Sequence, residues 1–568
     1  FGTSSWATNA VTASYNLNSV SSSYAATSSF PFQVTGSTLQ TTYGTRAFNA
    51  SVTNSIFIGS NTGTNAKHAS GSVFIGSAAG NSAYTASNSI FIGFNPGGSA
   101  YHAKNSVFLG EETGFFAYSA SNSFFAGRQA GYVASMASSS VMIGLQAGYN
   151  ATYGYYSNFI GHQAGSGSSG ALSNFLGYQA GALTPYVNSS NFLGYQAGFS
   201  ASFASNANFL GYQAGYLAEW GQNSNFIGQN AGYQARYAVQ SNFIGLQAGY
   251  QAVSASYSNF IGYSAGYTAT SASYSNFLGL AAGGNAVFAN NSNFLGQYAG
   301  NNATLAYDSN FLGQYAGYNA GSANKSNFLG YYAGYQASSA ANSNFIGINA
   351  GYQATTAHNS NFIGNSAGFN AVNTNNSNFL GQSAGYYATD ANNSNFSGYQ
   401  AGFQATAADN SNFLGYQAGM NAAGAARSNF IGYNAGYNAG NAQYSTFIGV
   451  QAGYQAQQSN NSTFIGNNAG YQATQAYFSN FIGEGAGTQA INARYTTFIG
   501  NSAGAGATNA YYANFFGEAA GLNAVSASNS IFIGTEAGRE AYYASSSNII
   551  GNYAGFNAYS ASYSNLFG

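Results

Sequence analysis

The chain has 568 residues, of which 45% are hydrophobic, 17% aromatic and only 3% charged, with a formal net charge of -1. This composition excludes intrinsic disorder, which requires low hydrophobicity and high charge, and it lacks the basic surface of a nucleic-acid-binding protein. The lack of cysteine excludes a disulfide framework and a thiol-based metal site, and no run of about 18 apolar residues predicts a membrane helix.

Residues 1–51 differ from the rest of the chain and form the first predicted segment, a neck or cap. The stretch SSWATNAVTASYNLNSVSSSYAAT (Ser4 to Thr27) spaces Trp6, Tyr15 and Tyr24 nine residues apart, each after a Ser. It resembles low-complexity segments of bacteriophage tail-fibre proteins. FPFQVTGSTLQTTYG (Phe30 to Gly44) predicts an extended strand and a turn that cover the first repeat.

Residues 52–568 form the second segment, a repeat domain. The glycine that closes each F-[IL]-G motif recurs every 17 residues from Gly59 to Gly161, then after 16 residues at Gly177, and again every 17 residues to Gly568. We count 31 copies with one single-residue deletion. The chain begins without Met and ends in repeat phase, so we interpret it as a processed or excised piece of a longer fibre.

Small residues keep a constant place in each repeat, counted from the closing glycine as position 0. A second glycine lies at position +4, usually after Ala, and Ala recurs at positions +7 and +10. Seventeen residues are too few for two packed helices and cannot bury a core alone, so each repeat must stack on its neighbours. These features predict an all-β parallel β-solenoid (β-roll) of about 30 coils, with glycines at the corners.

The predicted strand of each repeat has two apolar faces. Positions -3 and -1 share one face, whereas position -2, which is almost always Phe, takes the other. Our preferred prediction places positions -3 and -1 inside the coil and the Phe outside. The reverse orientation, and a flattened coil that buries both faces, stay open. The Phe side chains at position -2 are predicted to form either an oligomer interface, if they point outward, or a ladder in the core, if they point inward. This Phe row includes Phe57, Phe74, Phe91, Phe108, Phe159, Phe192 and Phe209.

An outward apolar row predicts self-association. A continuous stripe of about thirty large apolar side chains would cause aggregation unless another chain covers it. Three rods around a shared axis would cover three such stripes, whichever apolar face points outward. We therefore expect a homotrimeric rod.

The early repeats SVFIG (Ser72 to Gly76), SVFLG (Ser106 to Gly110) and SVMIG (Ser140 to Gly144) carry a family resemblance. With the glycine and alanine that follow, they resemble the S-V-A-I-G repeats in head domains of trimeric autotransporter adhesins. The resemblance covers residues 52–568 in phase, and it implies a trimeric β-roll with an adhesive role. The chain departs from that pattern by its longer period, its Phe in place of a small residue, and Asn in place of most Val.

Ionisable residues are too sparse to predict catalysis or metal binding. Glu484 and Glu518 share position +1 two coils apart, which predicts a separation of about 9.5 Å, near the upper limit for an inverting carboxylate pair. We interpret them as surface residues. His68 and His102 are likewise too far apart for one metal ion, and the adjacent Glu111 and Glu112 have no further calcium ligand in register. We expect no enzymatic activity, no metal and no cofactor.

Uncharged polar and aromatic side chains repeat instead. A charge at a repeated position would face its copy about 4.8 Å away, at a cost of roughly 0.9 kcal/mol per step even in water. Gln recurs at position +2, as in Gln129, Gln146, Gln163, Gln179, Gln196 and Gln213. Tyr recurs at position +5, and a glycan contact is predicted for the row Tyr132, Tyr149, Tyr216, Tyr233, Tyr250 and Tyr267, with corner packing as the alternative.

These features favour a structural or adhesive fibre of a virion or bacterial surface, outside the cell, that mediates or presents attachment. Its expected partners are copies of itself, as a homotrimer or a filament, and a cell-surface glycan or another surface, without nucleic acid or membrane insertion. Two alternatives remain: a secreted filament that assembles with itself, and an ice-binding solenoid. The latter should show a regular Thr array, whereas Thr is sporadic here.

Overall fold

The computed structural model describes residues 32–35, 38–41 and 53–568, with side chains from residue 53 onward. The chain divides into two compact units, Phe1–Leu278 and Gly279–Gly568, which are described separately below. The described residues contain strands and turns but no helix. The all-β fold class is therefore confirmed.

The first unit contains sixteen strands, and all but the first two are three residues long. They are β1 (Phe32–Thr35), β2 (Thr38–Thr41), β3 (Ile56–Ile58), β4 (Val73–Ile75), β5 (Ile90–Ile92), β6 (Val107–Leu109), β7 (Phe124–Ala126), β8 (Val141–Ile143), β9 (Asn158–Ile160), β10 (Asn174–Leu176), β11 (Asn191–Leu193), β12 (Asn208–Leu210), β13 (Asn225–Ile227), β14 (Asn242–Ile244), β15 (Asn259–Ile261) and β16 (Asn276–Leu278).

The second unit contains seventeen strands of the same length. They are β17 (Asn293–Leu295), β18 (Asn310–Leu312), β19 (Asn327–Leu329), β20 (Asn344–Ile346), β21 (Asn361–Ile363), β22 (Asn378–Leu380), β23 (Asn395–Ser397), β24 (Asn412–Leu414), β25 (Asn429–Ile431), β26 (Thr446–Ile448), β27 (Thr463–Ile465), β28 (Asn480–Ile482), β29 (Thr497–Ile499), β30 (Asn514–Phe516), β31 (Ile531–Ile533), β32 (Asn548–Ile550) and β33 (Asn565–Phe567).

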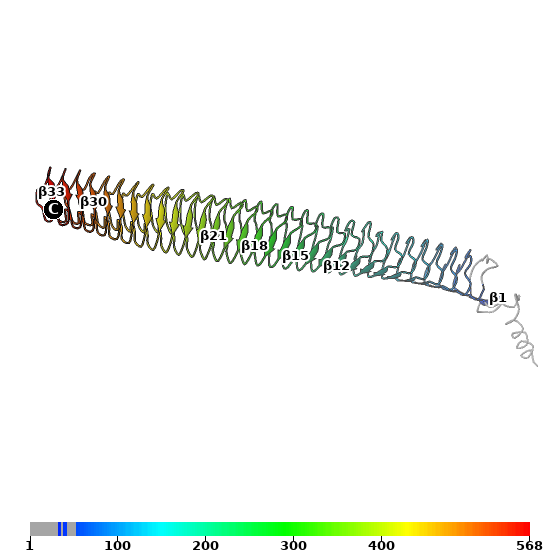
Figure 1. Cartoon of the computed structure of the whole chain (residues 1–568). Coiled ribbons are helices and arrows are strands. Elements are labelled where there is room, and N and C mark those ends of the chain that lie inside the picture. Colours follow the sequence, from blue (N-terminus) through cyan, green and yellow to red (C-terminus); the bar gives the residue numbers. More distant parts are fainter. Residues whose placement is uncertain (1–31, 36–37, 42–52) are drawn as a thin grey trace, which may run out of the picture. The chain divides into compact units, whose positions relative to one another are not determined.

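Each unit is a parallel β-solenoid. In the first unit, every strand from β3 to β16 pairs in parallel with the next, as Phe192 with Phe209. In the second unit, β17 to β33 pair in the same way. Figure 1 shows the strands of each unit stacked in chain order. The predicted solenoid with its 17-residue period is confirmed.

The segment before the first coil also contains strands. β1 pairs antiparallel with β2, and β2 pairs in parallel with β3, the first strand of the repeat. The extended structure predicted within residues 30–44 is thus confirmed for these two strands. Apart from β1 and β2, the predicted neck or cap at residues 1–51 lies outside the described residues, so its boundary stays a prediction.

The Phe at position -2 points into the coil. Phe192 is fully buried, whereas Leu193 at position -1 keeps 37% of its surface exposed. The preferred prediction, with Phe outside and positions -3 and -1 inside, is therefore wrong, and the reverse orientation is correct. All the predicted members of the row are fully buried: Phe57, Phe74, Phe91, Phe108, Phe159, Phe192 and Phe209.

The size of the core explains this orientation. In the coil of Phe192, the other buried apolar side chains are Ala197, Ala201 and Ala204, so one large ring fills a space otherwise lined by methyl groups. The Asn side chains at position -3 pair on the outside, where Asn191 Nδ2 donates to Asn208 Oδ1 at 2.8 Å. Since these amides satisfy each other in a row, they need no place in the core.

The two glycines are required by contact and by conformation. A Cβ atom on Gly198, at position +4, would lie 2.3 Å from the ring of Phe192. A Cβ atom on Gly194, at position 0, would lie 2.4 Å from the carbonyl oxygen of Gly211 in the next coil, and its φ is +135°. Both glycines have positive φ, which confirms the predicted corners.

Interactions between successive coils dominate the packing. The rings of Phe192 and Phe209 stack with centroids 4.7 Å apart and an interplanar angle of 5°. The buried Ser at position -4 adds a second row, because the Ser190 amide donates to Ser173 Oγ while Ser190 Oγ donates to the carbonyl of Ala204. Ser190 Oγ also accepts from the amide of Ala207, so one hydroxyl satisfies a buried amide of the next coil and a buried carbonyl of its own.

Replacing the inward ring should cost far more than replacing its outward neighbour. Phe192→Ala should lower the free energy of unfolding by about 3–5 kcal/mol, because it leaves a cavity at a fully buried site. Leu193→Ala should cost less than about 2 kcal/mol, because that side chain is only partly buried. Urea unfolding, with amide hydrogen exchange in the coils around residue 192, measures both. Equal costs for the two variants would contradict the orientation.

The Ser row predicts a stabilising substitution. Ala207 occupies position -4, so the next amide in the row, that of Ser224, has no hydroxyl to donate to, although Ser224 is only 1% exposed. Ala207→Ser should raise the free energy of unfolding by about 1 kcal/mol by supplying that acceptor. Ser190→Ala is the matched control and should lower it by about 1–3 kcal/mol. A loss of stability in Ala207→Ser, measured by thermal unfolding, would contradict this role.

Candidate functional surfaces

Amide side chains form hydrogen-bonded rows on the outer surface. At position +2, Gln146 Nε2 donates to Gln129 Oε1 at 2.9 Å, and Gln163 Nε2 donates to Gln146 Oε1 at 2.8 Å. The same bond joins Gln163 to Gln179, Gln179 to Gln196, and Gln196 to Gln213. The predicted Gln ladder is confirmed. Each amide inside the row donates one hydrogen bond and accepts another, and this chain of bonds stiffens the corner of the coil at position +2.

The Tyr side chains at position +5 form stacked rows. Tyr132 and Tyr149 stack at 5.2 Å, and the run from Tyr216 through Tyr233 and Tyr250 to Tyr267 stacks at 4.9–5.1 Å. Inside such a run, both ring faces contact neighbouring rings, so a sugar ring has no free face to stack on. A free aromatic face exists where a row ends. The glycan contact of these six residues stays a prediction.

Stacking and partial burial change the acidity of several phenols. Burial and the neighbouring Tyr side chains in the row raise the pKa of Tyr233, Tyr335 and Tyr454, while burial and Tyr387 raise the pKa of Tyr386. The largest change is at Tyr332, whose pKa is raised to about 12 by a hydrogen bond with Tyr331, by burial, and by nearby phenols. Ionised phenols stacked in a row repel each other, which favours the neutral form.

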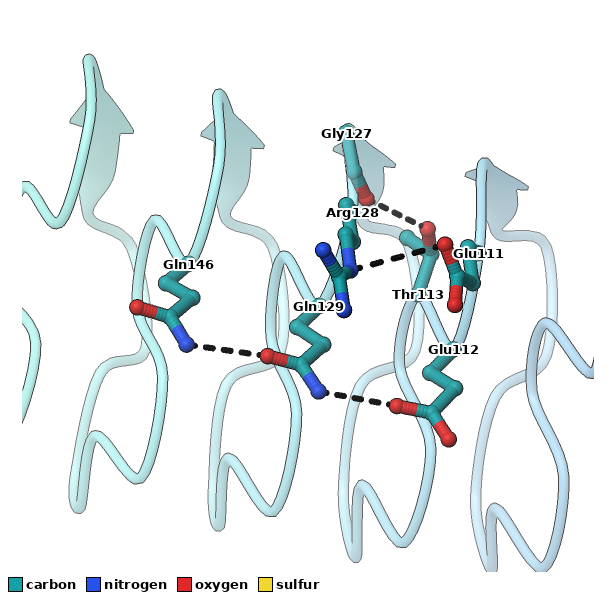
Figure 2. Close-up of polar contacts among 7 residues, drawn as sticks. All are labelled: Glu111, Glu112, Thr113, Gly127, Arg128, Gln129 and Gln146. Atoms are coloured by element: carbon teal, nitrogen blue, oxygen red, sulfur yellow. Dashed lines mark hydrogen bonds and ion pairs between the residues drawn. The ribbon is translucent and has the colours of Figure 1, made fainter.

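Glu111 and Glu112 contact different side chains of the next coil (Figure 2). Arg128 Nε lies 3.4 Å from Glu111 Oε2, and Gln129 Nε2 donates to Glu112 Oε2 at 2.8 Å. Glu112 thus begins the Gln row that continues to Gln146, while the nearby Thr113 donates its hydroxyl to the carbonyl of Gly127. The two carboxylates serve separate contacts between coils.

The other ionisable residues also lie apart. Glu484 and Glu518 are both exposed, and Asn501 occupies the same position in the coil between them. His68 packs against Tyr84, and His102 packs against Tyr101 and Tyr118. Within residues 53–568, no three His, Asp or Glu side chains gather in a way that could hold a metal ion.

These His contacts belong to a Tyr row that sequence reasoning missed. Tyr84, Tyr101 and Tyr118 lie at position +8 and stack at 4.7 and 5.2 Å. Lys67 precedes them in the same row, with its ammonium group 5.4 Å from the centre of the Tyr84 ring. The 17-residue spacing of the three Tyr was the available signal.

Two hollows on the surface were also missed. In the first unit, a groove of about 530 Å³ runs between positions +6 and +8 and contains Leu217, Gln234 and the ion pair of Glu219 with Arg236. In the second unit, a pocket of about 430 Å³ is lined by Tyr471, Glu484 and small or amide side chains. It brings Glu484, but not Glu518, into a concave site.

No protein-family model matches the chain, and no curated protein sequence matches it. Among the described residues, no helix has the length and apolar character needed to cross a membrane.

The raised phenol pKa predicts sensitivity to alkali. Because the pKa of Tyr332 is about 12 in the folded chain and about 10 when unfolded, its contribution to stability is complete below pH 10 and is lost as the pH rises towards 12. Absorbance titration of tyrosinate should therefore show a late-ionising fraction in the folded chain. Tyr332→Phe should reduce that fraction and the loss of thermal stability in this pH range. Ionisation of every phenol near pH 10 would contradict the prediction.

Proposed function

We propose that the chain is part of a structural and adhesive fibre on the surface of a virion or bacterium, where it holds an attachment element away from its base. The observation that supports this proposal is the direction of the interactions. In both units, strand pairs, Ser hydroxyls, amide rows and stacked rings all join one coil to the next. A stalk needs cohesion along its axis, and this arrangement supplies it.

Stiffness is the proposed mechanism. A coil cannot bend away from its neighbour without opening a strand pair, a Ser contact and an aromatic stack together. Because neighbouring coils are coupled in this way, stability grows with each added coil, as in other repeat proteins. The low charge is consistent with this role, since like charges in register would repel along the whole row.

We also propose that copies of this chain associate through the outward face of the strands. Leu193, Ile227 and Ile261 at position -1 keep 37%, 36% and 38% of their surfaces exposed. Covering such a remainder is worth roughly 0.6–1.1 kcal/mol per coil. The sum over β3 to β16 is therefore below about 15 kcal/mol, because half of these strands expose less than 36% at position -1 and β7 has Ala126 there. Association costs about 4–15 kcal/mol, so a stripe of many coils supports it and a short one does not.

A trimer is the proposed state, in keeping with the resemblance to the heads of trimeric autotransporter adhesins. Mass per unit length, from scanning transmission electron microscopy, separates the possibilities. A lone chain has one 17-residue coil per about 4.8 Å of fibre, and a trimer has three. A self-assembling filament that grows by bundling would give larger and variable values.

Polar substitutions at position -1 test whether the outward face of the strands is the surface through which the copies associate. Ser397 already occupies position -1 in β23, so a serine there is compatible with the coil. The triple variant Leu193→Ser, Leu210→Ser and Ile227→Ser should keep its strand content and shift the sedimenting species towards the single chain. A matched control replaces Gln234, Gln251 and Thr268 at position +6 with Ser and should stay associated. A wild-type fibre with one coil per 4.8 Å would overturn the proposed self-association.

A further inference from the structure

In the second unit, the run of stacked rings at position +5 that begins at Tyr437 ends at Tyr471. Tyr437, Tyr454 and Tyr471 stack at 4.9 and 5.1 Å, with interplanar angles of 8° and 5°. The next two residues at position +5 are Thr488 and Ala505, which have no ring to continue the row. One face of Tyr471 therefore contacts Tyr454, and the other borders the pocket of about 430 Å³.

Small side chains open the floor of this pocket. Position +2 carries Gln451 and then Asn468, but the next two coils have Gly485 and Ser502 there. A Cβ atom on Gly485 would have no neighbour nearer than 3.4 Å, so the backbone leaves room at this point. The pocket thus arises where two side-chain rows, the amides and the rings, are interrupted in the same coils.

Polar groups surround the free ring face. The exposed carboxylate of Glu484 lines the pocket, together with Asn501. Asn468 also lines it, but its Oδ1 is buried, as are those of Asn230 and Asn434 at the same position of other coils, so this oxygen belongs to the packing of the corner and not to the pocket surface. Thr488 Oγ1 donates to the carbonyl of Asn468 at 2.8 Å, which holds that hydroxyl at the pocket wall. The lining residues include no Lys or Arg.

We propose that this pocket binds a pyranose ring without negative charge, within a glycan on the attachment surface. This inference rests on the proposed adhesive function and names the class of its ligand. The apolar face of the sugar would stack on Tyr471, and its hydroxyl groups would donate to the Glu484 carboxylate and contact the exposed amide of Asn501. A few polar groups around an aromatic platform are what a sugar site requires.

The lack of a cation in the pocket sets its selectivity. A sugar carboxylate would face Glu484 with no positive partner, and two like charges at close range repel. A neutral sugar or an amino sugar has no negative charge for Glu484 to repel. The larger groove of the first unit is less suited, because Glu219 and Arg236 already pair with each other there, at 3.9 Å.

The decisive variant continues the row. Thr488→Tyr places a ring over the free face of Tyr471, as Tyr471 itself covers Tyr454, so the substitution repeats a packing that the fold already uses. Saturation-transfer NMR on the full chain would use the methyl glycosides of glucose, galactose, mannose and N-acetylglucosamine. We expect at least one of them to bind the wild-type chain and its affinity to fall at least tenfold in Thr488→Tyr.

Met420→Tyr is the matched control, because Met420 interrupts the row at position +5 between Phe403 and Tyr437. It adds the same ring away from the pocket and should leave binding unchanged. Glu484→Gln should weaken binding while leaving the fold intact, since Glu484 is exposed. Methyl glucuronide, the acidic counterpart, should bind the wild-type chain more weakly than methyl glucoside does.

Three outcomes would overturn the proposal: no neutral glycoside binds, binding is equal in the wild type and Thr488→Tyr, or methyl glucuronide binds best. The mass per unit length of the same samples distinguishes this failure from that of the fibre. If the fibre assembles but no sugar binds, the pocket proposal alone is wrong. If sugar binds to a chain that does not assemble, the fibre proposal alone is wrong.

Discussion

The fit of one phenylalanine ring against one glycine in each coil is the constraint on which the structure depends. The ring of Phe192 occupies the place that a Cβ atom on Gly198 would need, and the remaining apolar space is lined by alanine methyl groups. Because the core admits a single large side chain, the ring must lie directly above the ring of the previous coil. Strand register, corner position and the outward direction of the leucines all follow.

The same constraint explains what could be predicted from the sequence. The spacing of Gly194 and Gly198 and the short apolar strand were enough for the solenoid, its period and its corners. The direction of Phe192 was not, since Leu193 is equally apolar and alternation alone cannot tell inside from outside. The useful signal was volume: three alanines and a glycine recur in phase with the ring, and this set fills a narrow core without Leu193.

The candidate pocket was beyond sequence reasoning for a different reason. Tyr471, Glu484 and Gly485 belong to two successive coils, and their proximity depends on how the backbone turns between positions 0 and +6. Residues with positive φ, such as Asn468 and Gln472, produce that turn, and no periodic pattern reveals where their side chains then point. The interruption of the Tyr row at position +5 was visible in the sequence. That it opens a pocket could be seen only once the structure placed the neighbouring row of position +2 beside it.

The coil of 16 residues shows which part of the repeat can change in length. Its two ladders stay in register, with Asn158 beside Asn174 and Thr152 beside Ser169, so the missing residue comes from the stretch between Ser169 and Asn174. A loss there leaves the pairing groups undisturbed. The solenoid therefore tolerates a change in coil length at this corner, because the residues between the two ladders form no pairing that a shorter connection would break.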